Sequence, residues 1–130
     1  MKKVSKERVS RYRKDLVELL SRLKHLCMKA GHEGVIFRGT PVNVYRKCGK
    51  SGCRCEEGGE ARHGPYRVIQ TWDKGKQRQI SLKGSEGKYF EMAKHYQYQQ
   101  QNRRRIIKIQ EEILKQVDLM LKARTIWEKE

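Results

Sequence analysis

Apolar side chains recur every three or four positions over residues 5–30. This spacing is the a/d pattern of a helix that packs along one stripe, as in a coiled coil. Gly31 follows the last apolar position, and we expect it to end the helix in the left-handed conformation that glycine adopts readily. The pattern predicts a first helix from about Ser5 to Ala30, and its apolar stripe consists of Val9, Tyr12, Leu16, Leu19, Leu23, Leu26 and Ala30.

A second helical pattern runs from about Glu86 to Trp127, with no proline and no glycine after Gly87. The polar and basic run QYQQQNRRR at 97–105 weakens its apolar stripe. One long helix, or two helices that meet near this run, would fit the pattern. The apolar positions after the run are Ile106, Ile109, Ile113, Val117, Met120 and Leu121.

The segment between the helices is rich in glycine and in residues that favour strands. The run GVIFRGTPVNVYRK at 34–47 predicts one or two short strands, broken at Gly39–Pro41. The runs YRVIQTW at 66–72 and KQRQISL at 76–82 flank the residues DKG. They predict a hairpin with a three-residue turn, in which glycine takes the position that needs a positive φ.

Together these patterns predict an α+β fold. Two long helices form an antiparallel, coiled-coil-like hairpin, and a small antiparallel β-ribbon is inserted between them. We expect a single domain over residues 1–130, with helix 1 in 1–33, the cysteine-rich ribbon in 34–85 and helix 2 in 86–130.

The two predicted helices differ in length, at about 39 Å and about 63 Å. If they run antiparallel from the sheet, the end of the longer helix has no partner in its own chain. An exposed apolar stripe usually marks an interface, so this end predicts a homodimer or docking on a larger protein partner. The stripe consists of Val117, Met120, Leu121 and Trp127.

Three cysteines and a histidine lie close together in the middle of the sequence. Cys48, Cys53, Cys55 and His63 have the spacing C-x4-C-x-C-x7-H, which supplies the four ligands of tetrahedral zinc. Clustered thiols in a reducing compartment are more often metal ligands than disulfides. Three free thiols in a solvated loop are the alternative, and His32 is the next candidate for the fourth ligand. The neighbouring cations that favour thiolates are Lys47, Lys50, Arg54 and Arg62.

The fourth cysteine, Cys27, lies outside this cluster. It follows Leu26 in the predicted first helix. Free cysteine behaves as a small hydrophobic residue, so we expect Cys27 to be buried.

The charge of the chain points to a polyanionic partner. The sequence has 31 Lys and Arg against 15 Asp and Glu, a net charge of +16, which makes nucleic acid the first candidate and anionic lipid the second. Tyr66 and Trp72 of the predicted hairpin could stack on bases, but a sheet this small needs aromatic residues in its core, so we interpret them as core residues that pack the sheet on the helices. The residues expected to contact nucleic acid are Lys47, Lys50, Arg54, Arg67, Lys74, Lys76, Arg78, Arg103, Arg104 and Arg105.

Several other classes of protein find little support in the sequence. No apolar run approaches the length that spans a bilayer, and the basic amino terminus has no apolar signal region after it. We therefore expect a cytoplasmic or nucleoid-associated protein. Phosphate-binding loops, nucleophile-elbow motifs and paired carboxylates are absent from the sequence, so we expect no catalytic activity. A thiol nucleophile paired with His63 is a distant alternative.

The middle of the chain resembles a family. The block that carries Cys48, Gly49, Lys50, Cys53 and Cys55, then HGPY at 63–66 and GKQR at 75–78, is similar to an uncharacterised prokaryotic family of unknown function. The resemblance covers about residues 34–125, and its members share a C-G-[KR]-x-x-C-x-C…H-G-P-Y signature. Ser51 and Arg67 depart from the residues that are usual there, and neither is a candidate ligand. Such proteins are often encoded near transposases, which implies a link to mobile elements.

The resulting hypothesis is a non-catalytic nucleic-acid-binding protein with a zinc-stapled β-ribbon. The mobile-element context implied by the resemblance favours DNA over structured or guide RNA. A helical assembly adaptor for a recombinase or another larger partner is the rival from a different class. Steep salt dependence of nucleic-acid binding would separate the two, because phosphate contacts release counterions.

Overall fold

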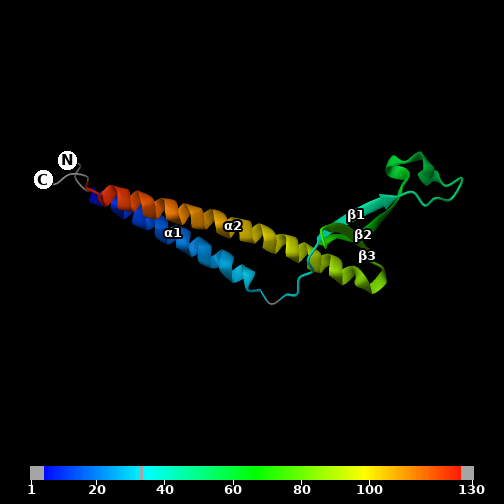
Figure 1. Ribbon diagram of the computed structural model, residues 1–130, viewed down its shortest axis with the longest axis horizontal. Coiled ribbons are helices and arrows are strands. Elements are labelled where there is room, and N and C mark those ends of the chain that lie inside the picture. Colours follow the sequence, from blue (N-terminus) through cyan, green and yellow to red (C-terminus); the bar gives the residue numbers. More distant parts are fainter. Residues whose placement is uncertain (1–4, 33, 127–130) are drawn as a thin grey trace. The chain divides into compact units, whose positions relative to one another are not determined.

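The structure is a computed structural model, and it describes residues 5–32 and 34–126. The elements are α1 (Lys6–Ala30), β1 (Thr40–Arg46), the short 3-10 helices η1 (Arg54–Glu57) and η2 (Gly59–Ala61), β2 (His63–Asp73), β3 (Lys76–Ser81), η3 (Gly84–Glu86) and α2 (Gly87–Arg124) (Figure 1). The α+β class is confirmed. The chain forms two compact units, one of α1 with α2 from Gln100 onward, and one of segment 34–99.

The first helix begins and ends close to the predicted residues. Ser5 caps it, because its hydroxyl oxygen accepts a 3.2 Å hydrogen bond from the backbone N–H of Arg8. At the other end, Gly31 has φ −84°, so the expected left-handed cap is wrong. The N–H of Gly31 instead bonds to the carbonyl of Met28 at 3.1 Å. This tighter last turn satisfies a terminal carbonyl without a positive φ.

The second helical pattern forms one continuous helix, α2, of 38 residues. Its polar run at 97–105 does not break it. Among the described residues, no helix is long and apolar enough to cross a membrane.

Within the first unit, α1 lies antiparallel to the later part of α2. The side chain of Asn102 bonds to the carbonyl of Leu26, and Lys6 and Arg13 line a small pocket together with Arg124. Leu19 of α1 and Ile109 of α2 are the buried apolar side chains of this unit among the described residues.

This offset corrects the predicted overhang. Because the pairing starts at Asn102, α1 reaches the end of α2, and Val117 and Met120 are half-buried. Leu121 is exposed, and Trp127 lies outside the described residues. The prediction failed because residues 87–99 of α2 belong to the other unit, so α1 does not begin its pairing at the first turn of α2. The apolar overhang therefore no longer supports a dimer.

Within the second unit, the three strands form an antiparallel sheet in the order β1-β2-β3. One strand, β1, forms in the segment for which one or two strands were predicted, and it begins at Thr40, inside the predicted break at Gly39–Pro41. Asp73 pairs with Lys76, so the hairpin turn has two residues and not three. Its residues Lys74 and Gly75 both have positive φ, at 49° and 78°. Two positive φ values match the twist of the flanking strands, which is why this turn type is common in hairpins.

The core of this unit is aliphatic at its centre. Val68 and Ile69 are both fully buried. Successive strand residues point to opposite faces, so both faces of β2 are covered at this point. Phe90 and Ala93 in the first turns of α2 are also buried, and the N–H of Phe37 bonds to the carbonyl of Met92 at 3.2 Å.

The two aromatic residues expected in this core are on the surface. Trp72 is 67% exposed and Tyr66 is 48% exposed, so their interpretation as core residues is wrong. The aliphatic pair at the middle of β2, together with the first turns of α2, fills the interior that the sequence analysis assigned to the aromatics.

Candidate metal centre

Four potential ligands converge on the loop between β1 and β2. One ligand atom from each of Cys48, Cys53, Cys55 and His63 lies within 4.8 Å of all the others. Cys53 immediately precedes η1, Cys55 lies in it, and His63 is the first residue of β2. The sequence prediction of this ligand set is confirmed as a group that can hold a metal ion. His32, the alternative fourth ligand, is not part of the group.

The sheet holds the two ends of the loop together. Arg46, the last residue of β1, pairs with His63 in the antiparallel register. The register shifts between Val44 and Arg46, where Gly64 and Pro65 of β2 lie across from Tyr45. This bulge turns the start of β2 and thereby sets the position of His63.

Gly64 is required by this bulge. It has φ +141°, which L side chains rarely adopt, and a Cβ there would lie 2.7 Å from the carbonyl oxygen of Val44. The close approach of two backbones therefore fixes a glycine directly after the histidine ligand.

The ligand separations fit a tetrahedral ion. The Sγ atoms of Cys48 and Cys55 are 3.4 Å apart, and Cys53 Sγ lies 3.2 Å from His63 Nε2. A tetrahedron with Zn–S bonds of about 2.3 Å has edges of about 3.8 Å. None of the four cysteines of the chain forms a disulfide. The four ligand atoms can therefore close around one ion after small adjustments.

Hydrogen bonds within the loop favour the thiolate of Cys53. The backbone N–H of Cys55, then the Cys55 thiol and the His63 ring, lower the pKa of Cys53 to about 6. A thiolate is the form that binds metal. Cys53 is therefore the ligand that is ready to bind near neutral pH.

Cys55 has the opposite tendency. The backbone N–H of Cys48 donates to its Sγ at 3.3 Å and lowers its pKa, but burial and the neighbouring thiols of Cys53 and Cys48 raise it, and the net shift is upward. Cys55 is only 1% exposed. A cation at the centre of the group would offset this burial cost by stabilising the thiolate.

Cys27, outside the cluster, is exposed. The prediction that it is a buried hydrophobic residue is wrong, because its position in α1 falls beside the apolar stripe and not on it.

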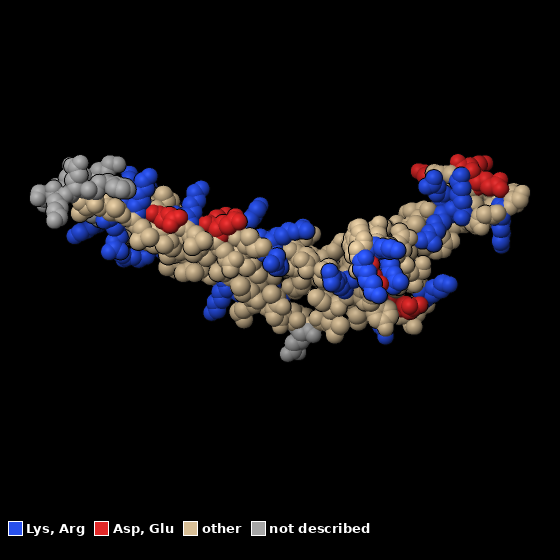
Figure 2. Space-filling view, viewed as in Figure 1, with Lys and Arg blue, Asp and Glu red and all other residues tan. Residues whose placement is uncertain are grey.

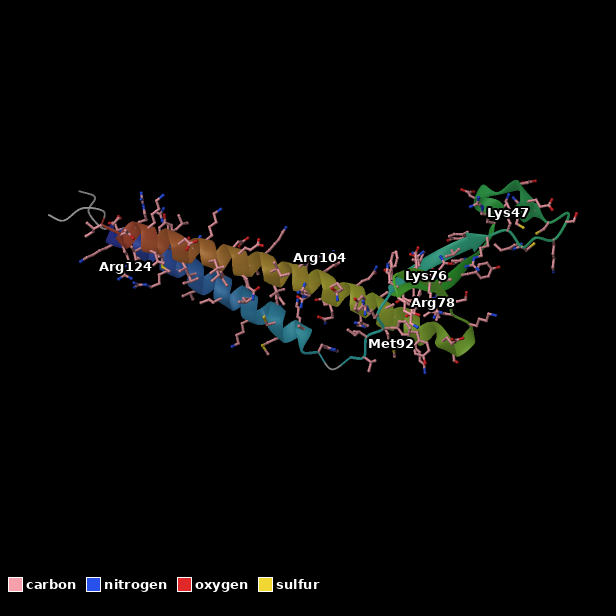
Figure 3. The ribbon with its side chains drawn as sticks, in the orientation of Figure 1. Lys47, Lys76, Arg78, Met92, Arg104 and Arg124 are labelled. Atoms are coloured by element: carbon pink, nitrogen blue, oxygen red, sulfur yellow. The ribbon has the colours of Figure 1, made fainter. Side chains whose placement is uncertain are left out.

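The basic residues expected to contact nucleic acid fall into three places. Lys47, Lys50 and Arg54 lie in or beside the cysteine loop, which also carries acidic side chains (Figure 2). A second group lies on the sheet, where Figure 3 labels Lys76 and Arg78. The third, Arg103, Arg104 and Arg105, lies in the other unit on α2. The first two groups therefore lie in segment 34–99 and the third in the helix pair.

Two of the sheet cations are engaged within the chain. The guanidinium of Arg67 lies 5.3 Å from the centre of the Phe90 ring, and Arg78 forms a 3.2 Å ion pair with Asp73. The Arg67 contact is a cation–π interaction on a core residue. Lys74 and Lys76 have no such partner among the described residues, so they are the free cations of the hairpin.

The exposed aromatic residues of β2 are the surface feature that the sequence analysis set aside in favour of a core role. Trp72 is exposed and stands two residues before Lys74 of the turn, whereas Lys76 pairs with Asp73 and lies on the opposite face of the ribbon. The signal was present, since the strand alternation puts Trp72 and Tyr66 on the face opposite to Ile69. Val68 shares that face and is apolar, so the face could not be distinguished from a core face by its sequence pattern.

The comparisons with known proteins give one match. A family model described as Domain of unknown function (DUF6788) matches residues 6–88, well over half of the chain, and the chain belongs to this family. The matched region includes all of α1, which the sequence resemblance did not, and it ends in the first turn of α2. No curated protein and no solved structure matches the chain.

Proposed function

We propose that this protein is a non-catalytic nucleic-acid-binding protein that uses its β2–β3 hairpin for contact. The Cys3His cluster holds a structural zinc ion that orders the neighbouring loop. DNA is the first candidate ligand, and RNA is the second.

The observation that carries the proposal is the exposed indole of Trp72. Its side chain is 67% exposed although the core of the unit is small and needs apolar area. Lys74 and Lys76 follow it within the same hairpin. Lys74 lies in the turn two residues after Trp72, whereas Lys76 pairs with Asp73 and so projects from the face opposite to Trp72. An exposed aromatic side chain with a free lysine close to it in the turn can stack on a base while the lysine contacts an adjoining phosphate. The net charge of +16 supports a polyanionic partner.

The exposed aromatic also bears on the form of the nucleic acid. Stacking on a side chain requires a base that is not already stacked between two neighbours. We therefore expect single strands or unpaired regions to bind more tightly than a fully paired duplex of the same length.

The metal assignment follows from the donor set. Thiolate and imidazole donors select zinc over magnesium or calcium, which prefer oxygen. Four protein ligands leave no open coordination position, and a closed site is typical of structural zinc. The role of the ion is then to hold the loop 47–62 against the start of β2, and because it binds the folded state its binding free energy adds to the stability of the fold.

Fluorescence anisotropy with labelled single-stranded DNA, single-stranded RNA and duplex DNA tests the proposal. We expect binding with a steep salt dependence, and Trp72→Ala should raise Kd roughly 5- to 150-fold, corresponding to one stacked base. Tyr98→Ala is the matched control, because Tyr98 is also exposed but lies on α2. Absence of binding at low salt, or equal effects of the two variants, would refute the proposed function of the hairpin.

A further inference from the structure

The helix pair of the first unit contains a groove that the sequence did not suggest. It has a volume of about 640 Å³ and is lined from both helices. Basic side chains predominate in it. The charged or titratable lining residues are Arg22 and His25 of α1, and Arg105, Lys108 and Glu112 of α2.

Helical spacing explains why these residues meet. Residues three, four or seven positions apart lie on one face of a helix, so Arg105, Lys108 and Glu112 form one wall. Arg22 and His25 form the other. Ile109, at 4% exposure, lies between the walls and closes the floor of the groove. The packing of the two helices thus fixes the spacing of the cations.

Among the described residues, no ion pair neutralises the cations of the groove. Both ion pairs found among the described residues, Arg78–Asp73 and Lys94–Glu91, belong to the other unit. Arg22, Arg105 and Lys108 therefore carry three positive charges against the single carboxylate of Glu112, which is not paired with them. Convergence of unpaired like charges is unfavourable without a counter-charge and attracts anions.

Only one arginine of the run at 103–105 in α2 lines the groove. Successive helix residues point about 100° apart, so Arg103, Arg104 and Arg105 cannot form one flat patch. Of the three, Arg105 lines the groove, where it is joined by Lys108 one turn later. Figure 3 labels Arg104 on the same stretch of α2.

We propose that this groove binds the phosphodiester backbone of a nucleic acid, as a second contact surface separate from the hairpin. The inference rests on the proposed function and adds to it. Cations on both walls of an open groove match a linear polyanion, whereas a single inorganic phosphate would leave most of the volume unfilled. Arginine and lysine side chains that contact phosphate fix position without reading sequence.

Salt dependence measures these contacts directly. Each phosphate contact on a single strand contributes about −0.7 to the slope of log K against log salt concentration. The triple variant Arg22→Gln, Arg105→Gln and Lys108→Gln should therefore reduce the magnitude of the slope by about 2. The variant Lys14→Gln, Lys115→Gln and Lys122→Gln removes the same charge from exposed positions outside this groove and should leave the slope close to that of the wild type.

A footprint on the wild-type protein avoids any effect of the substitutions on folding. Lys108 and Lys115 are both exposed on α2, so their acetylation rates by a small amine-reactive ester can be compared by mass spectrometry. We expect single-stranded nucleic acid to protect Lys108 several-fold and Lys115 little. Equal protection of both lysines, or an unchanged slope in the groove variant, would overturn the inference.

Two further outcomes distinguish the groove proposal from the proposed function of the hairpin and from a small-anion site. If the groove variant keeps the wild-type slope while Trp72→Ala weakens binding, the proposed function stands and the groove proposal fails. If inorganic triphosphate protects Lys108 as well as an oligonucleotide does at equal phosphate concentration, the groove is a small-anion site and the nucleic-acid assignment is wrong.

Discussion

The side-chain amide of Asn102 donates a 2.9 Å hydrogen bond to the backbone carbonyl of Leu26, 76 residues earlier in the chain. Asn102 is only 2% exposed, and its Oδ1 has no hydrogen-bond partner among the residues that the structure describes. A polar residue on the packed face of a helix pair costs stability but specifies the register of the helices. Asn102 thus explains why α1 pairs with the later part of α2.

Replacing Asn102 by leucine should stabilise the helix pair. The change loses one hydrogen bond, worth about 1 kcal/mol, but it removes an unsatisfied acceptor and buries more apolar area. We expect the free energy of unfolding, measured by urea denaturation, to rise by about 1 kcal/mol. Ile109→Ala, on the same face, should lower it by about 2–5 kcal/mol. A loss of stability in Asn102→Leu would show that Oδ1 has a favourable partner in solution.

The substitution Gly64→Ala should lower the zinc affinity of the metal centre by distorting the backbone next to His63. The added methyl group would meet the carbonyl of Val44, and the φ of +141° is strained for alanine. Since His63 directly precedes Gly64, we expect lower zinc affinity in a competition with a chromophoric chelator. Gly49→Ala is the control. It also has a positive φ, but its Cβ would have open space, so only a strain of about 1 kcal/mol applies. Equal affinities of the two variants would contradict the role of the bulge.

In the metal-free protein, the alkylation rate of each cysteine should depend on the environment of its thiol. With a pKa of about 6 in the folded state against an ordinary thiol value of 9.0, Cys53 is largely thiolate at pH 7. The partners that lower this pKa contribute stability that is fully present above pH 9 and is lost as the pH falls towards 6.

At pH 7 we therefore expect iodoacetamide to modify Cys53 faster than the exposed Cys27, and the buried Cys55 most slowly. Added zinc should protect the cluster while Cys27 still reacts. Peptide mass spectrometry gives each rate, and protection of Cys27 by zinc would indicate binding elsewhere.

Substitutions of the hairpin cations should have two different effects, because some of these residues stabilise the fold and others bind nucleic acid. Lys74→Ser with Lys76→Ser should flatten the salt slope for single-stranded nucleic acid by about 1.4. Arg67→Gln should mainly lower stability, by about 0.5–1 kcal/mol, because its guanidinium lies over the Phe90 ring. Anisotropy and thermal unfolding distinguish the two effects. A larger slope change in Arg67→Gln than in the lysine pair would reverse this assignment.

The sequence predicted the elements whose signals are local. The apolar periodicity placed α1 and α2, the turn residues placed the hairpin, and the spacing of Cys48, Cys53, Cys55 and His63 identified the ligand group. These features depend on residues close in sequence, where helical and strand geometry decide which side chains meet.

The features that the sequence did not predict depend on long-range packing. The offset of α1 along α2 follows from Asn102, whose partner is far away in the chain. The exposure of Trp72 depends on how completely Val68, Ile69 and Phe90 fill a core, and periodicity does not measure volume. The groove was hidden because its cations come from two separate helices.

Zinc stoichiometry tests the central claim about the cluster most directly. Protein purified without added metal should contain one zinc per chain by elemental analysis, and Cys53→Ser should reduce this sharply while Cys27→Ser leaves it unchanged. The account predicts this because four ligand atoms within 4.8 Å of one another complete a tetrahedral site. A folded wild-type protein with no zinc, and with the three cluster thiols reacting freely in the presence of added zinc, would contradict it.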